Sequence, residues 1–219
     1  MIKENIVNFK KKIPENVTLV AVSKTKPISD LQEAYDAGQR VFGENKVQEM
    51  VEKYDALPKD IQWHMIGHLQ SNKVKYMAHF VDLIHGVDSF KTLIEINKQA
   101  ARHQRKINCL LQADIANEET KFGLPFDEIQ TILTSEEFAK LENISIVGLM
   151  GMATFTENKQ QISNEFTSLK QLFVALKNTH PSFEILSMGM SGDYEIAIKN
   201  GSNMIRVGSA IFGHRNYIL

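Results

Sequence analysis

A lysine directly follows an apolar run near the start of the chain. The run Val17–Ser23 is rich in β-branched residues, and Lys24 comes next, before a polar turn closed by Pro27. An amine is costly to bury unless it has a partner or a role, and desolvation makes it a better nucleophile toward an aldehyde. A lysine taken alone more often extends from a strand end into water. With the residues described next, Lys24 suggests Schiff-base chemistry.

Two glycine-rich segments with hydroxyl side chains lie near the end of the chain. One holds Ser191 and Gly192, and the other holds Gly208 and Ser209. Glycine lets a backbone approach an anion closely, while free N–H groups and hydroxyls donate hydrogen bonds to it. Each segment alone is typical of an ordinary tight turn, but two of them after the last two predicted strands favour a phosphate site.

An arginine lies two residues before the second of these segments. Arg206 cannot lose its charge, so inside a barrel it needs an acceptor. Two partners are open: a carboxylate such as Glu44, or a ring nitrogen of a bound ligand. An imine-forming lysine, a phosphate cup and this arginine together suggest pyridoxal 5'-phosphate, abbreviated PLP.

The elements that must position these residues alternate between strand and helix. Strands are predicted over Val17–Ser23, Arg40–Glu44, Ile61–Gly67, Leu83–Val87, Ile107–Asp114, Ile144–Met150, Phe183–Met188 and Met204–Val207. Helices are predicted at the N-terminus and over Ser29–Ala37, Val47–Leu57, Asn72–His79, Phe90–His103, Phe126–Leu133, Glu136–Leu141, Asn158–Asn178 and Tyr194–Asn200.

This alternation predicts an α/β protein with a single (β/α)8 TIM barrel over residues 1–219 and an extra N-terminal helix. Several strands are apolar on both faces, as in a parallel sheet covered by helices. An open doubly wound sheet is the alternative, but the first strand ends in Ser23-Lys24-Thr25-Lys26, without the glycine-rich turn typical of that fold.

Composition excludes several classes of function. The 219 residues carry a net charge of −1, which gives no basic bias toward nucleic acid, and no apolar stretch is long enough to span a bilayer. The N-terminus has no continuous apolar segment typical of a signal peptide.

Cys109 is the only cysteine, so no internal disulfide can form. No cluster has metal-site spacing. We expect a cytoplasmic monomer.

Five segments, taken together and in order, resemble the pyridoxal phosphate homeostasis protein family. They are Ala21-Val22-Ser23-Lys24-Thr25-Lys26-Pro27, Phe42-Gly43-Glu44-Asn45, His64-Met65-Ile66-Gly67-His68-Leu69-Gln70-Ser71-Asn72-Lys73, Leu186-Ser187-Met188-Gly189-Met190-Ser191 and Arg206-Val207-Gly208-Ser209-Ala210-Ile211-Phe212-Gly213. The resemblance covers nearly the whole chain and implies the barrel of the alanine racemase N-terminal domain.

The resemblance also implies a role for individual residues. Lys24 resembles the lysine that carries PLP as an internal aldimine, and Arg206 the arginine that hydrogen-bonds the pyridine nitrogen. Ser191, Gly208 and Ser209 resemble the phosphate contacts. Asn45 resembles a residue near the aldimine and Met188 one that packs by the ring. Lys26 and Lys121 are further lysines at the predicted mouth, and the sequence does not assign their roles.

Three functions compete at this point. A cofactor carrier that supplies PLP to apo-enzymes, without robust turnover, is preferred, and the alternative is a racemase-like amino-acid enzyme. A racemase needs a second base on the opposite face of the substrate carbon, and we expect no second domain to supply it, with Tyr217 as a poor substitute. A phosphate-sugar enzyme with a Schiff-base lysine also stays open, although its acid–base partner cannot be placed.

Overall fold

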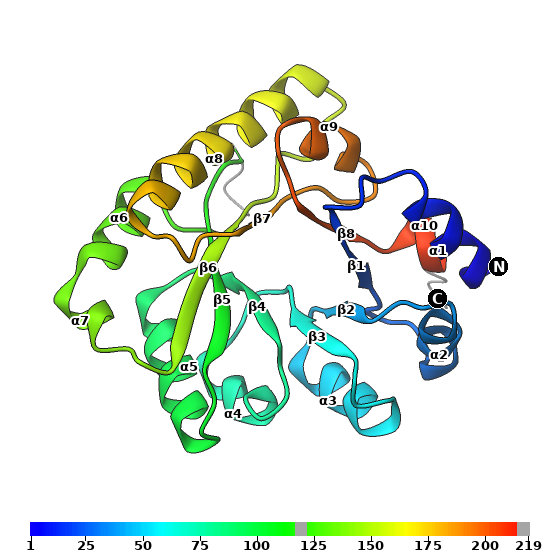
Figure 1. Cartoon of the computed structure of the whole chain (residues 1–219), viewed down its shortest axis with the longest axis horizontal. Helices are drawn as coiled ribbons and strands as arrows, with labels where there is room; N and C mark the ends of the chain where they lie inside the picture. The colour runs from blue at the N-terminus through cyan, green and yellow to red at the C-terminus, as the bar shows by residue number, and fades with distance from the viewer. Residues whose placement is uncertain (117–121, 214–219) are drawn as a thin grey trace.

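The strands close into a parallel barrel with the helices outside (Figure 1). A computed structural model describes residues 1–116 and 122–213. Within these ranges eight strands follow one another round the ring in chain order, and β8 pairs in parallel with β1 to close it. The predicted (β/α)8 barrel is confirmed, and the open doubly wound alternative is wrong. The single-domain assignment stays a prediction.

The elements have the following bounds. The strands are β1 Thr18–Val22, β2 Val41–Glu44, β3 Gln62–Met65, β4 Leu83–Val87, β5 Ile107–Gln112, β6 Ile144–Met150, β7 Ile185–Ser187 and β8 Met204–Val207. The α-helices are α1 Ile2–Lys10, α2 Ile28–Asp36, α3 Val47–Ala56, α4 Val74–Met77, α5 Phe90–Arg102, α6 Phe126–Thr134, α7 Glu136–Ala139, α8 Lys159–Thr179, α9 Tyr194–Lys199 and α10 Ser209–Phe212, with a 3-10 turn η1 at Ser71–Lys73.

Several predicted strands are longer than the observed ones. The predicted strand Ile61–Gly67 extends past both ends of β3, because Ile61 before it is buried and Ile66 and Gly67 after it are partly buried. A Cβ at Gly67 would lie 2.5 Å from the Asn45 carbonyl oxygen, so the chain here packs tightly against the segment after β2. The predicted helix Asn72–His79 is divided into η1 and α4. Helix α10 has only four residues and leaves no periodic signal in the sequence.

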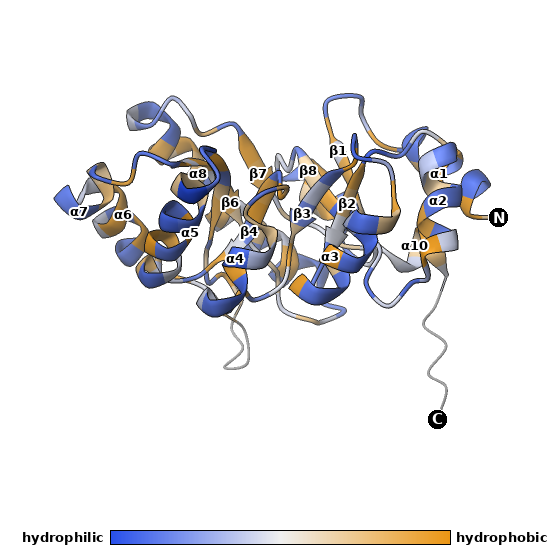
Figure 2. Ribbon diagram, turned by 90° about the horizontal axis from the view of Figure 1, so that it is seen from below, coloured by the Kyte–Doolittle hydropathy of each residue, from blue (hydrophilic) through white to orange (hydrophobic). Residues whose placement is uncertain are grey.

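Apolar side chains form two clusters. The larger one lies between the strands and the helices, where orange concentrates in Figure 2 while the outer helix turns are largely blue. The smaller one fills the barrel interior with inward side chains from five strands: Val20, Leu83, Leu110, Met150 and Met204. This apolar plug occupies the interior below the strand ends that carry the predicted site.

Nowhere in residues 1–116 or 122–213 is a helix both long and apolar enough to cross a membrane.

Candidate functional site

The predicted site residues follow the carboxyl ends of four strands that are neighbours in the ring. Lys24 follows β1, Asn45 follows β2, Ser191 follows β7, and Gly208 and Ser209 follow β8. The ring order is β2, β1, β8, β7. Because the carboxyl ends of parallel strands meet at one face of a barrel, these residues come together at one part of its mouth.

The turn that carries Lys24 is held from the outside by helix α3. Lys24 is partly buried, and Thr25 after it has a φ of 64°, in the left-handed region that a β-branched residue rarely adopts. The Thr25 N–H donates to Glu49 Oε1 at 2.6 Å. On the other side of Lys24, the Ser23 carbonyl accepts from Lys53 Nζ at 2.7 Å. These contacts stabilise a strained turn, as is common where a side chain must be aimed at a ligand.

A buried charged pair underlies this turn. Lys53 Nζ lies 2.7 Å from Glu44 Oε1, and the two side chains are 5% and 0% exposed. Glu44 Oε1 also accepts from the Ser23 hydroxyl at 2.6 Å, whereas Glu44 Oε2 is buried without a hydrogen-bond partner. Burial raises the pKa of Glu44, and Lys53 opposes that shift. Sequence analysis missed Lys53, because its spacing is that of any helix residue.

The two glycine-rich loops contact each other. The Gly208 N–H donates to Ser191 Oγ at 3.4 Å, and Ser209 begins helix α10. A Cβ at Gly208 would lie 3.1 Å from the Val22 carbonyl oxygen and 3.3 Å from Val22 Cβ, so the loop runs close against β1. A hydroxyl, a glycine backbone and a second hydroxyl therefore gather beside the strand that leads to Lys24, as a phosphate cup requires.

Arg206 is buried inside the barrel. Its NH1 group donates to the Ser187 carbonyl at 2.9 Å and to the Ser187 hydroxyl at 2.6 Å, and its NH2 group donates to the Gly151 carbonyl at 3.0 Å. The Glu44 partner considered from the sequence is wrong: Glu44 is on the outward face of β2 and pairs with Lys53. Burial lowers the pKa of Arg206 to about 10, while Asp193 acts in the opposite direction. The group therefore stays cationic at neutral pH.

A polar layer lies above the apolar plug. His85, Gln112, Ser187 and Arg206 each stand two residues after an inward apolar residue of the same strand, so they share its inward face. All four are at least 96% buried. Sequence analysis did not select His85. A histidine in the middle of an apolar strand, two residues after Leu83 and so on the same face, could have indicated a buried polar group.

The two buried histidines should make the protein acid-sensitive. Burial is the main cause that lowers the pKa of His64 and of His85; Arg206 adds to it at His85, while Asp82 opposes it at His64. Below about pH 6.5, the ordinary histidine value, the unfolded chain therefore binds more protons than the folded one. The free energy of unfolding should fall as the pH falls below that value.

Urea unfolding at a series of pH values measures this dependence. A His85→Gln variant has one buried histidine fewer, so its free energy of unfolding should fall less steeply over the same range. An equally steep fall in the variant would assign the acid sensitivity to other groups.

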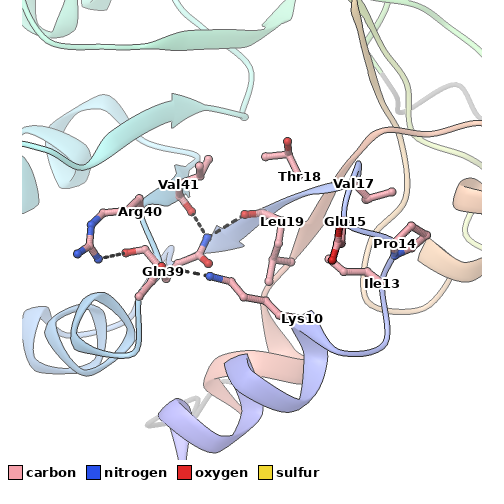
Figure 3. A pocket seen from close by; sticks show the side chains of 11 residues that line it. Lys10, Ile13, Pro14, Glu15, Val17, Thr18, Leu19, Gln39, Arg40 and Val41 are labelled. Carbon is pink, nitrogen blue, oxygen red and sulfur yellow. Dashed lines mark hydrogen bonds between the residues drawn. The ribbon is translucent and has the colours of Figure 1, made fainter.

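A hollow lies at the end of the barrel opposite the mouth. This cavity of about 360 Å³ is lined by residues before β1 and β2 and by the end of α1 (Figure 3). Its two cations have partners: Lys10 Nζ donates to the Gly38 carbonyl at 3.2 Å, and Arg40 Nε lies 3.0 Å from Asp60 Oδ2. The cavity contains none of the predicted site residues. We therefore place the functional site at the mouth, where the amine, the hydroxyls and the buried arginine gather.

Comparison with known proteins identifies the family of the chain. The family described as "Alanine racemase, N-terminal domain" matches residues 1–216. A pyridoxal phosphate homeostasis protein of Haemophilus influenzae is 42% identical over 206 residues, which cover 92% of this chain and 86% of the relative. The chain belongs to the pyridoxal phosphate homeostasis protein family. The family resemblance drawn from the sequence is thus confirmed.

Solved structures of a similar protein share the barrel. PipY of Synechococcus elongatus without PLP is 33% identical, with a TM-score of 0.92 over 97% of this chain and 100% of that chain. The structure of PipY with PLP bound has a TM-score of 0.87 and covers the same fractions of both chains. The fold of this homeostasis-family chain therefore matches a protein whose structure is known with and without PLP.

Asn45 and Met188, implied by the family resemblance, and the further lysine Lys26 have different surroundings. Asn45 is partly buried at the mouth, beside Gly67. Met188 is fully buried in the large outer cluster, one residue past Ser187 and on the opposite face of that chain segment, so its packing by a ligand ring stays a prediction. Lys26 Nζ donates to the Phe212 carbonyl at 2.9 Å, at the end of α10. Lys121 and Tyr217 lie outside the described residues.

Proposed function

We propose that this chain binds PLP in the mouth of the barrel, covalently through Lys24, and serves PLP homeostasis by holding and supplying the cofactor. The observation that carries the proposal is the meeting of Lys24, the Ser191–Gly208 contact and buried Arg206 at the ends of neighbouring strands. The PLP-bound structure of PipY and the names of the curated relatives support it.

The residues at the mouth fit the chemistry of this cofactor. PLP supplies an aldehyde that reacts with an amine and an aromatic ring that withdraws electrons. Lys24 provides the amine, and its turn is held on both sides by α3. Ser191, Gly208 and Ser209 provide hydroxyl and backbone donors for the phosphate. Arg206 provides a fixed cation for the ring nitrogen, because two carbonyls and a hydroxyl orient its guanidinium.

The identity of the group opposite the ring nitrogen favours a carrier over an amino-acid enzyme. Arg206 remains cationic at neutral pH and donates a hydrogen bond rather than a proton. A ring nitrogen held in this way withdraws electrons weakly, which limits chemistry at a substrate carbon but does not by itself exclude racemisation. The curated relatives are named for homeostasis and not for a reaction. We further propose that the protein acts in the cytoplasm, in keeping with its free, buried cysteine. We propose that it acts there as a monomer.

Removing both hydroxyls of the cup should weaken cofactor retention without unfolding the barrel. In a Ser191→Ala, Ser209→Ala variant, the loss of hydrogen bonds to a charged phosphate should cost about 1.5–3 kcal/mol for each serine. Both side chains are at least partly exposed, so little packing is lost. Titration with PLP, followed by absorbance, measures the change in affinity. Unchanged affinity would show that the two loops are ordinary turns.

A transfer assay tests the carrier function. The PLP-loaded protein is incubated with the apo form of a PLP-dependent enzyme and, separately, with a panel of L-amino acids. We expect the apo-enzyme to regain activity while the amino acids stay unchanged. A Lys24→Ala protein taken through the same loading is the control for free PLP carried over. Rapid racemisation or other conversion of an amino acid, lost in Lys24→Ala, would overturn the carrier function in favour of a racemase-like enzyme.

A further inference from the structure

A continuous chain of buried polar groups runs through the barrel interior to Arg206. Arg206 NH1 donates to Ser187 Oγ at 2.6 Å, and Ser187 Oγ lies 3.0 Å from His85 Nδ1. His85 Nε2 lies 3.0 Å from His64 Nδ1, and His64 Nε2 lies 3.5 Å from Asp82 Oδ2. The four inner groups are at most 4% exposed, whereas the Asp82 side chain is 47% exposed.

This series of polar groups crosses the barrel from one end to the other. Asp82 comes immediately before β4, so it lies at the amino-terminal end of the strands, away from the mouth. Arg206 belongs to the polar layer near the carboxyl ends. The groups come from β3, β4, β7 and β8, so no local segment of the chain could build this connection. An exposed carboxylate at one end of the barrel is thereby joined to the cation at the candidate site.

The charges at the two ends determine where every proton in the chain lies. The Asp82 carboxylate carries no proton and lies 3.5 Å from His64 Nε2, so it favours the neutral His64 tautomer with the proton on Nε2, whose Nδ1 accepts. His85 must then donate from Nε2 and accept at Nδ1. Among the residues that the structure describes, Ser187 is the donor given to His85 Nδ1, so its O–H points there and its lone pairs remain for Arg206. Both histidines have a lowered pKa, caused mainly by burial, as this arrangement of neutral rings requires.

We propose that Asp82, His64, His85 and Ser187 are positioning residues that orient Arg206 toward its ligand, with Asp82 setting the direction of every hydrogen bond from the far end of the barrel. The inference rests on the proposed function, since the ligand of Arg206 is the ring nitrogen of PLP. This positioning role explains why two histidines are buried in a barrel interior that apolar side chains could otherwise fill. The fixed lone pairs of Ser187 hold the plane of the Arg206 guanidinium. Arg206 therefore needs little rearrangement when the ligand binds.

The tautomers of the histidines test the chain in the absence of any ligand. In the native protein, the ¹⁵N chemical shifts of the imidazoles should show both His64 and His85 protonated on Nε2 at neutral pH. Asp82→Asn replaces the carboxylate by an amide that can donate as well as accept, so both rings should become tautomer mixtures. Asp60→Asn is the matched control: Asp60 is also an exposed carboxylate at this end of the barrel, paired with Arg40 instead. It should leave both rings unchanged.

The affinity for PLP tests whether the chain acts on the site. Asp82→Asn should weaken PLP binding about three- to tenfold, which corresponds to one lost hydrogen bond, while Asp60→Asn should not. Ser187→Ala cuts the chain next to Arg206 and should weaken binding at least as much. In the Ser187→Ala background, Asp82→Asn should then have no further effect, because its route to Arg206 is gone.

The outcomes separate the two proposals. If the native protein takes up no PLP, the proposed function fails. The histidine tautomers, measured without ligand, still show whether the hydrogen bonds from Asp82 to Arg206 have the proposed direction. If Asp82→Asn leaves both tautomers unchanged, the directed chain is overturned. If the tautomers change while PLP affinity does not, or if Asp82→Asn acts equally with and without Ser187, the role in positioning Arg206 is overturned.

Discussion

Replacing Lys24 with alanine should abolish the visible absorbance band of covalently bound PLP in the purified protein. Lys24 follows β1 beside the phosphate cup, and α3 holds its turn through Ser23 and Thr25. A covalent bond to the cofactor needs an amine at this position, and alanine supplies none. The measurement is the absorbance spectrum after loading with PLP and dialysis. Borohydride reduction followed by peptide mass spectrometry then locates the modified lysine.

The matched control is Lys26→Ala, two residues further along the same turn. Lys26 Nζ donates to the carbonyls of Phe212 and Gly213 at the end of α10, so its amine is used to hold that segment. We expect this variant to keep the covalent absorbance band. If Lys24→Ala retains a full spectrum and the modified peptide carries Lys26 or Lys121 instead, the assignment of Lys24 is wrong.

Replacing Lys53 with methionine should destabilise the protein by about 3–5 kcal/mol at neutral pH, the usual cost of removing one partner of a buried ion pair. Glu44 is fully buried and its Oε2 atom already has no partner, so only the Ser23 hydroxyl would remain to stabilise the carboxylate. The same change frees the Ser23 carbonyl, and we expect weaker PLP retention as well. Urea unfolding measures the first effect and PLP titration the second.

The pH dependence of this variant identifies the cause. Burial raises the pKa of Glu44, and without Lys53 that pKa rises further. At low pH the carboxyl is protonated in both the folded and the unfolded state, so the loss of stability should be small there and grow as the pH rises. A loss that is constant with pH would indicate a packing defect instead.

Two further variants control for the loss of a lysine. Adding Glu44→Gln to Lys53→Met removes the buried charge and should recover much of the lost stability. Lys98→Met removes an exposed lysine that lies 3.6 Å from Glu95 on α5. It should change stability by less than about 0.5 kcal/mol, as is usual for surface pairs.

The sequence by itself determined the barrel and which residues follow the carboxyl ends of its strands. Alternating apolar runs and helical periods are local patterns, and parallel strands that follow one another in order leave few topologies open. The carboxyl ends of such strands must share one face. Their positions after predicted strands therefore predict that Lys24, Ser191 and Ser209 lie at the same end of the barrel.

Only the tertiary structure decided which partner each buried charge has. Arg206 pairs with Ser187 and not with Glu44, because the alternation along β2 places Glu44 on the outer face against Lys53. His85 and Ser187 are 102 residues apart in the chain and meet only through the closure of the ring. Such contacts depend on strand register and on inward or outward orientation, and a shift of one residue reverses both, so no local pattern encodes them.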